Sequence, residues 1–128
     1  MTPQESHPPF RVLYIEDSAL VREVTSELLA RDSREIVAVG SGEEALAAFE
    51  RNRFDIVITD IGLPEMSGLD LARKIKHLAP SMPVILASGY PLDLGDMRLG
   101  PKIRAIRKPF DSQQLDAVIH ELCGSDSA

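Results

Sequence analysis

Residues 54–68 read FDIVITDIGLPEMSG, and this stretch decides the fold class. Ile56 to Thr59 consists only of β-branched residues, which is typical of a central parallel strand buried on both faces. The strand leads directly into Asp60, and Pro64 and Gly68 then mark a loop. The stretch therefore predicts a buried strand whose carboxyl end carries an acidic residue.

The same alternation of a short apolar run and an amphipathic segment repeats along the chain, which predicts βαβ units around a parallel sheet. We expect five strands, at residues 12–15, 36–39, 56–59, 84–87 and 103–107. Charged residues in the last of these runs are consistent with a strand at the edge of the sheet.

Helices are predicted between these strands and after the last one. The first predicted helix places a set of apolar residues on one face: Leu20, Val21, Val24, Leu28 and Leu29. Ser41 with Glu44 and Asp111 with Gln114 have the spacing of capping boxes, and Ser67 is a suitable cap before residues 68–78. Gly124 is the expected stop of the last helix.

Length and composition limit the organisation of the chain. The 128 residues predict one domain, at residues 10–123, between a disordered leader at 1–9 and a disordered tail at 124–128. A net charge of -6 argues against direct binding to nucleic acid. A single cysteine, no zinc spacing and no membrane anchor in the first residues favour a cytoplasmic location without membrane attachment.

Polar residues follow four of the predicted strands, where side chains of a parallel sheet converge in one crevice. They are Glu16, Asp17, Asp60, Ser88 and Lys108. Three carboxylates at about 4 Å would repel one another by roughly 4 kcal/mol per pair at an effective dielectric of 20, so a cation is expected among them. Hard oxygen ligands point to Mg²⁺ as the cofactor, held by Glu16, Asp17 and Asp60.

These groups suit phosphoryl transfer. An aspartate carboxylate is ionised at neutral pH, so Asp60 needs no general base to act as a nucleophile. The Lys108 ammonium would neutralise phosphoryl charge, and the Ser88 hydroxyl would donate a hydrogen bond to a phosphoryl oxygen. Taken singly, each residue has a plainer explanation as a solvated charge, a cap or a turn residue, and only their convergence favours a site.

Four motifs resemble response-regulator receiver domains of two-component signalling: Tyr14-Ile15-Glu16-Asp17, Asp60 to Pro64 with Met66 and Gly68, Ala87-Ser88-Gly89, and Lys108-Pro109-Phe110. The resemblance implies a flavodoxin-like, doubly wound α/β fold with strand order 2-1-3-4-5 and helices on both faces of the sheet. It also implies Asp60 as phosphoacceptor, the Gly62 carbonyl as a metal ligand and a cis bond between Lys108 and Pro109. The implied donor is a histidine kinase or histidine phosphotransfer protein, with an unknown output protein. The sequence from Pro83 to Pro91 is similar to receivers of hybrid histidine kinases.

One departure concerns signal output. The family usually carries Tyr or Phe three residues before its lysine, and this chain has Ala105. The stretch from Tyr90 to Lys102 is rich in Pro and Gly, so a fourth helix there is expected to be short or poorly ordered. Ordering of that segment is one way to read out phosphorylation.

Three other functions compete with this interpretation. A flavodoxin-like cofactor site would place phosphate against Glu16 and Asp17, which repel it. A phosphatase of the haloacid dehalogenase type needs a second acid where Gly62 stands, so a turnover enzyme is not expected. A receiver-like interaction module that is not regulated by phosphorylation stays open. His7, His77, His120 and Cys123 are assigned no role, and Lys102, Arg104 and Arg107 are attributed to protection of the sheet edge.

Overall fold

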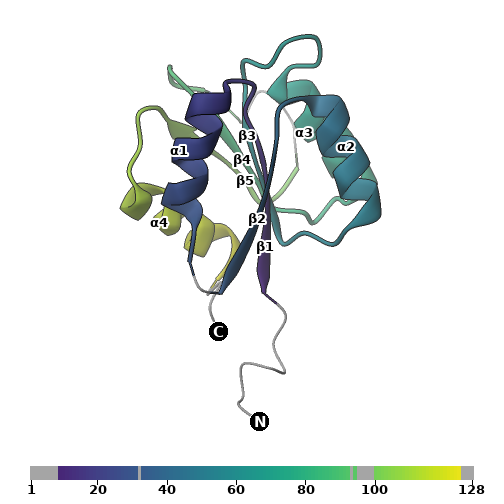
Figure 1. The fold of residues 1–128 in the computed structure, drawn as a ribbon. Coiled ribbons are helices and arrows are strands. Elements are labelled where there is room, and N and C mark those ends of the chain that lie inside the picture. Colours follow the sequence, from purple (N-terminus) through teal and green to yellow (C-terminus); the bar gives the residue numbers. More distant parts are fainter. Residues whose placement is uncertain (1–8, 32, 93, 95–99, 125–128) are drawn as a thin grey trace.

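The computed structural model describes residues 9–31, 33–92, 94 and 100–124 (Figure 1). Nine elements follow one another in these residues: β1 (Phe10–Ile15), α1 (Ala19–Leu29), β2 (Arg34–Val39), α2 (Gly42–Arg51), β3 (Ile56–Asp60), α3 (Gly68–Leu78), β4 (Val84–Ser88), β5 (Ile103–Arg107) and α4 (Ser112–Cys123). The predicted leader and tail lie almost wholly outside the described residues.

The five strands form one parallel sheet in the order β2-β1-β3-β4-β5. Helices α1 and α4 cover one face of the sheet, and α2 and α3 cover the other (Figure 1). The prediction of a doubly wound, flavodoxin-like sheet in the order 2-1-3-4-5 is confirmed. β5 lies at an edge of the sheet as predicted, and its exposed residues are Arg104 and Arg107.

The strands divide their side chains between two separate hydrophobic clusters, because successive residues of a strand point to opposite faces. In β1, Leu13 and Ile15 pack in the cluster under α2 and α3, whereas Val12 and Tyr14 pack in the cluster under α1 and α4. All five residues of β3 are buried, as expected of the central strand. Because β1, β3, β4 and β5 are parallel neighbours in the sheet, their carboxyl ends meet along one edge of it.

The predicted caps form, with one difference. Ser67 accepts a hydrogen bond from the Asp70 N–H, and Asp111 and Gln114 form a reciprocal capping box. Ser41 also accepts from the Glu44 N–H, but the Glu44 carboxylate bonds to the Gly40 N–H instead of returning to the Ser41 N–H.

Helix α1 forms where predicted, but only part of its predicted apolar face packs against the sheet. Thr25 and Leu29 are its buried residues. Leu20, Val21 and Val24 are 72%, 40% and 51% exposed. The apolar spacing predicted the helix correctly, and Leu29 of the predicted face is buried. Thr25, which the spacing did not include, is buried beside it and contacts the phenol of Tyr14. An apolar strip is left on the outer surface of α1.

No α-helix includes the described residues between β4 and β5, namely 89–92, 94 and 100–102, and the rest of that segment lies outside the described part. Its end is held by Lys76 of α3, which the sequence did not single out. The Lys76 Nζ donates to the carbonyls of Met82 at 2.8 Å and of Pro80 at 3.2 Å, and also to that of Pro101. Burial, followed by the charge of Lys102, lowers the pKa of Lys76.

None of the helices among the described residues is both long enough and apolar enough to span a bilayer.

Candidate functional site

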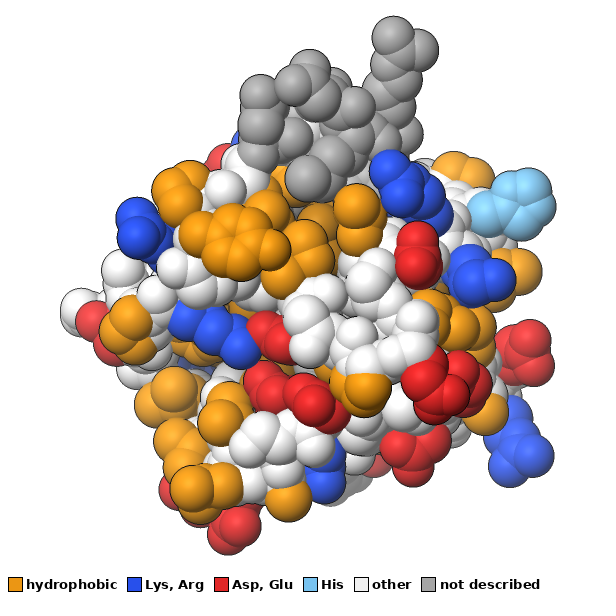
Figure 2. All heavy atoms as spheres, turned by 90° about the horizontal axis from the view of Figure 1, so that it is seen from above, with side chains coloured by type: hydrophobic (Ala, Val, Ile, Leu, Met, Phe, Trp, Pro, Cys, Tyr) orange, Lys and Arg blue, Asp and Glu red, His pale blue; other side chains and the backbone are white. Residues whose placement is uncertain are grey.

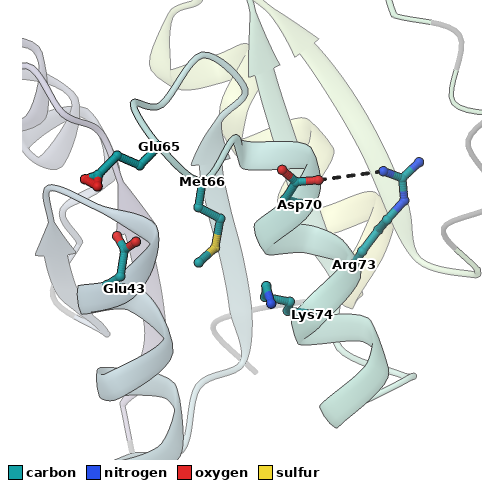
Figure 3. A pocket seen from close by; sticks show the side chains of 6 residues that line it. All are labelled: Glu43, Glu65, Met66, Asp70, Arg73 and Lys74. Carbon is teal, nitrogen blue, oxygen red and sulfur yellow. Dashed lines mark ion pairs between the residues drawn. The ribbon is translucent and has the colours of Figure 1, made fainter.

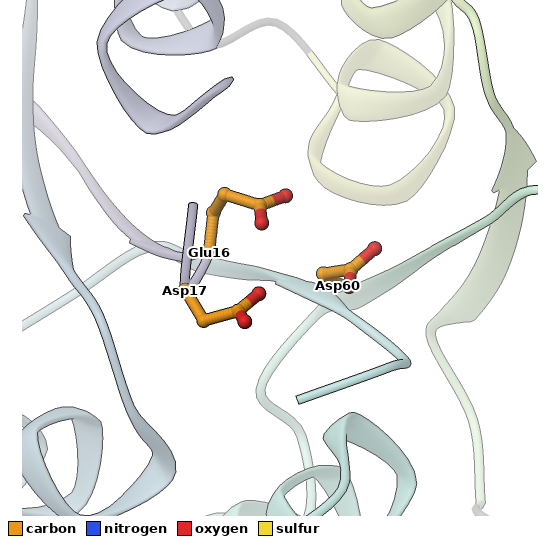
Figure 4. A group of neighbouring side chains, drawn as sticks. All are labelled: Glu16, Asp17 and Asp60. Atoms are coloured by element: carbon orange, nitrogen blue, oxygen red, sulfur yellow. The ribbon is translucent and has the colours of Figure 1, made fainter. Parts of the chain in front are cut away.

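Three carboxylates meet at the edge of the sheet where the strands end. Glu16 and Asp17 directly follow β1, and Asp60 is the last residue of β3, so the pairing of these strands places them side by side. One oxygen from each carboxylate lies within 4.8 Å of the others. The three side chains point toward a common space (Figure 4). Glu16 and Asp60 are buried, whereas Asp17 is exposed.

Lys108 closes this group from the end of β5. Its Nζ pairs with Asp60 Oδ1 and lies 3.4 Å from Glu16 Oε1. The bond between Lys108 and Pro109 is cis, as the family resemblance implied. Seen from above the sheet edge, acidic side chains gather in the middle of the face beside a basic one (Figure 2). The crevice therefore combines three negative groups with one positive group.

Backbone contacts fix the groups around Asp60. The Gly62 N–H donates to Asp60 Oδ2 at 3.2 Å. The buried Ser88 hydroxyl accepts from the Tyr90 N–H at 3.1 Å, and the Ser88 carbonyl accepts from the Lys108 N–H at 2.7 Å. A side chain at Gly68 would bring its Cβ within 2.1 Å of the Asp60 carbonyl oxygen, so only glycine lets α3 begin this close to β3.

The pKa shifts in the crevice follow from burial and charge. Burial raises the pKa of the Glu16 carboxyl, and the Ser18 N–H and the Lys108 ammonium lower it by less. Burial alone would lower the pKa of Lys108, but its hydrogen bond to Asp60 and the charges of Asp60 and Glu16 raise it. Burial also raises the pKa of Tyr14, directly beneath the site, to about 12.

This donor set fits a hard divalent cation. Carboxylate oxygens are the ligands that Mg²⁺ prefers, and Mg²⁺ binds to few protein ligands because it keeps several waters. Two buried carboxylates with only one ammonium between them leave negative charge that a cation would compensate. Among the described residues, Glu16, Asp17 and Asp60 form the one group of acidic, His or Cys side chains with such a geometry.

The predicted site residues are thus brought together in one crevice at the ends of β1, β3, β4 and β5. Sequence reasoning missed Arg22, whose Nη1 donates to the Glu16 carbonyl at 2.6 Å. A charged residue on a helix gave no signal of this contact, because the contact depends on how α1 returns over the loop. The described histidines, His77 and His120, are exposed, as expected for surface residues.

A separate hollow of about 600 Å³ lies between α2 and α3 (Figure 3). It is lined by both acidic and basic side chains: Glu43, Glu65, Met66, Asp70, Arg73 and Lys74. Arg73 and Asp70 form an ion pair at 4.0 Å across one wall. The hollow has no set of converging carboxylates, so the candidate site remains the crevice at the strand ends.

Comparison with known proteins agrees with this geometry. Residues 12–120 match the family model of the response regulator receiver domain. The chain is 35% identical over 100 residues to protein-glutamate methylesterase/protein-glutamine glutaminase 1 of Paramagnetospirillum magneticum. The matched region covers 77% of this chain and 26% of that protein. The chain spans less than half the length of the curated relatives it matches.

Two solved structures show the same architecture. A response regulator receiver domain protein from Clostridium thermocellum superposes with a TM-score of 0.78 at 31% identity, covering 88% of this chain and 93% of that one. The receiver domain of the hybrid histidine kinase CckA superposes with a TM-score of 0.74 at 29% identity, covering 88% of this chain and 98% of that one.

The chain therefore belongs to the response regulator receiver domain family. Receiver domains are phosphoacceptors of two-component systems that bind Mg²⁺ at an acidic pocket. They interact with histidine kinases or phosphotransfer proteins and with output domains. The acidic cluster of this chain is consistent with Mg²⁺ binding and with a phosphoacceptor aspartate.

Proposed function

We propose that Asp60 accepts the phosphoryl group, with Mg²⁺ held by Glu16, Asp17, Asp60 and the carbonyl of Gly62. The observation that carries this assignment is the convergence of three carboxylates within 4.8 Å on a single lysine ammonium. Asp60 is the member of the group that touches both Lys108 and the Gly62 N–H, so it lies at the centre of the donors that phosphoryl charge requires.

The transfer follows from the contacts of Asp60. A carboxylate oxygen attacks the phosphorus of a phosphohistidine on the side opposite the P–N bond. As the new O–P bond forms, the P–N bond breaks, its electron pair returns to the imidazole, and an acyl phosphate remains on Asp60. Lys108 then pairs with a phosphoryl oxygen instead of the free carboxylate, and the Ser88 hydroxyl donates to another.

A bound Mg²⁺ supplies positive charge to the phosphoryl oxygens and reduces the repulsion between them and the carboxylates. Glu16, Asp17 and Asp60 are the residues that would hold it. Glu16 is fixed for this task by the Ser18 N–H, which donates to its Oε2 at 3.0 Å.

The phosphodonor is a histidine kinase or a histidine phosphotransfer protein, and the outer face of α1 is where it docks. That face is apolar and lies beside the acceptor crevice. A hollow of about 240 Å³ lies between α1 and the loop that connects β5 to α4, and Lys108 is among its lining residues. It is lined by Tyr14, Val21, Val24, Thr25, Leu28, Lys108, Pro109 and Phe110. Apolar surface at this position is suited to burial against a helical partner.

The chain itself performs no turnover on a separate substrate. It transfers the phosphoryl group to its own Asp60 and releases it by hydrolysis, and the output protein is recognised through the change in this crevice. The methylesterase/glutaminase relative is matched over only 26% of its length, and the rest of that protein is not used in this proposal.

Intact-mass measurement after incubation with Mg²⁺ and acetyl phosphate tests the proposal. We expect one phosphate adduct on the wild type and none on Asp60→Asn, which keeps the side-chain shape and removes the nucleophile. Asp70→Asn serves as the matched control, since Asp70 is an exposed aspartate on α3 outside the crevice.

Removal of Mg²⁺ with EDTA should abolish the adduct on the wild type. An adduct that persists on Asp60→Asn contradicts the assignment of the acceptor. If neither protein is modified although Mg²⁺ binds, the chain is an interaction module that phosphorylation does not regulate.

A further inference from the structure

The peptide that carries Glu16 is held from both sides. On one side the Glu16 N–H donates to the carbonyl of Val39, at the end of β2, at 3.1 Å. On the other side Arg22, one turn into α1, donates from Nη1 to the Glu16 carbonyl at 2.6 Å. Because both backbone groups of Glu16 are bonded, its side chain and that of Asp17 leave the chain in fixed directions.

The guanidinium of Arg22 reaches this carbonyl through space that Gly40 leaves free. A Cβ atom at Gly40 would lie 3.0 Å from Arg22 Nη1 and 3.4 Å from Glu44 Oε1. The Glu44 carboxylate in turn accepts the Gly40 N–H at 3.1 Å. The loop between β2 and α2 and the loop between β1 and α1 are therefore fitted to each other around one arginine.

We infer that Arg22 is a positioning residue for the metal site, an inference that rests on the proposed Mg²⁺ binding by Glu16 and Asp17. Arg22 does not need to touch the ion. It fixes the Glu16–Asp17 peptide so that both carboxylates face Asp60 before the ion arrives, which spares the cost of ordering the loop on binding.

Two effects of Arg22 on Mg²⁺ affinity have opposite signs, and this makes the inference testable. As a positive charge close to the site, Arg22 repels the ion, so its removal would tighten Mg²⁺ binding if charge alone mattered. As a hydrogen-bond donor that orders the loop, it favours binding, so its removal would weaken it. The sign of the change in Kd distinguishes the two.

The experiment is a calorimetric titration of Mg²⁺ into the metal-free chain and into Arg22→Met. We expect the Kd of Arg22→Met to be about tenfold weaker, the size typical of losing a group that orients metal ligands. Arg22→Lys, which keeps the charge and one donor, should recover part of the affinity. Arg51→Met makes the same substitution at an exposed position at the end of α2 and should match the wild type.

A second readout needs no metal. The Ser18 N–H is bonded to the Glu16 carboxylate, so its hydrogen exchange should accelerate in metal-free Arg22→Met, while that of Ile75 in the core of α3 should not change. Gly40→Val keeps the arginine and its charge but fills the space of the guanidinium, and it should weaken Mg²⁺ binding as well.

Unchanged or tighter Mg²⁺ binding by Arg22→Met overturns the inference. If Arg22→Met does not fold, Gly40→Val decides, and wild-type affinity in that variant has the same meaning. A wild-type chain that binds no Mg²⁺ refutes the proposed metal site itself, which is a separate outcome of the same titration.

Discussion

Neutralising Glu16 should stabilise the metal-free protein and remove its response to Mg²⁺. At 4.8 Å and an effective dielectric of about 20, repulsion between Glu16 and each neighbouring carboxylate is about 3.5 kcal/mol. Attraction to the Lys108 Nζ at 3.4 Å returns about 5 kcal/mol. With both carboxylates counted in full, the balance is about 2 kcal/mol against the folded state. Solvent screening of the exposed Asp17 lowers this figure, and the desolvation of Glu16 raises it.

The test is urea denaturation of the wild type and Glu16→Gln, each in EDTA and in Mg²⁺. In EDTA we expect Glu16→Gln to unfold with a free energy about 1–2 kcal/mol higher, because glutamine keeps the acceptor for the Ser18 N–H and Lys108 keeps Asp60 as a partner. With Mg²⁺ at tenfold its Kd the wild type should gain about 1.4 kcal/mol and the variant almost none.

Glu23→Gln is the matched control, since Glu23 is an exposed acid in the middle of α1 and its loss should change stability by less than about 0.5 kcal/mol. A metal-free Glu16→Gln protein that is less stable than the wild type would refute the reasoning, because the carboxylate would then be favourable in the empty crevice.

Three further predictions concern the pH response and two local contacts. Burial raises the pKa of the Glu16 carboxyl above its ordinary 4.5. Protonation of Glu16 therefore contributes to stability at pH values below 4.5, and this contribution is lost as the pH rises through the raised pKa. The advantage of Glu16→Gln in EDTA should therefore grow from acid to neutral pH, and an advantage independent of pH would contradict it. Gly68→Ala should lower the free energy of unfolding by about 2 kcal/mol, since its Cβ meets the backbone of Asp60 at 2.1 Å, and urea denaturation with unchanged stability would show that α3 shifts freely. Asp111→Ala removes the N-cap acceptor for the Gln114 N–H at 2.8 Å and should lower the thermal stability by an amount equivalent to about 1 kcal/mol, whereas Asp111→Asn should retain most of it.

The sequence predicted the sheet because its signals are local. Uninterrupted β-branched runs such as Ile56 to Thr59 predicted strands. Ser67 and Asp111 predicted the starts of two helices, because their side chains can accept the first free N–H groups of a helix, as they do here. The strand order came from resemblance to a family, since periodicity contains no information on which strands become neighbours.

What the sequence did not predict depends on contacts between distant segments. In the sequence, the exposed Leu20, Val21 and Val24 of α1 looked like part of a core-facing stripe. The sequence did not show that Thr25 is buried in their place, because its hydroxyl bonds to the distant Tyr14. Lys76 and Arg22 looked like ordinary surface charges. Their partners are backbone carbonyls, which have no sequence signature.

The division of strand side chains between two clusters makes the sheet a partition. Volume removed on the α2–α3 side, for example at Ile75, cannot be refilled from the α1–α4 side, for example from Ile119, because a fully hydrogen-bonded backbone lies between them. The free-energy effects of substitutions in different clusters should accordingly add, and those within one cluster should couple. Sequence drift in the interior of the α2–α3 side is thereby insulated from the packing of Tyr14 and Ile106 on the other side of the sheet.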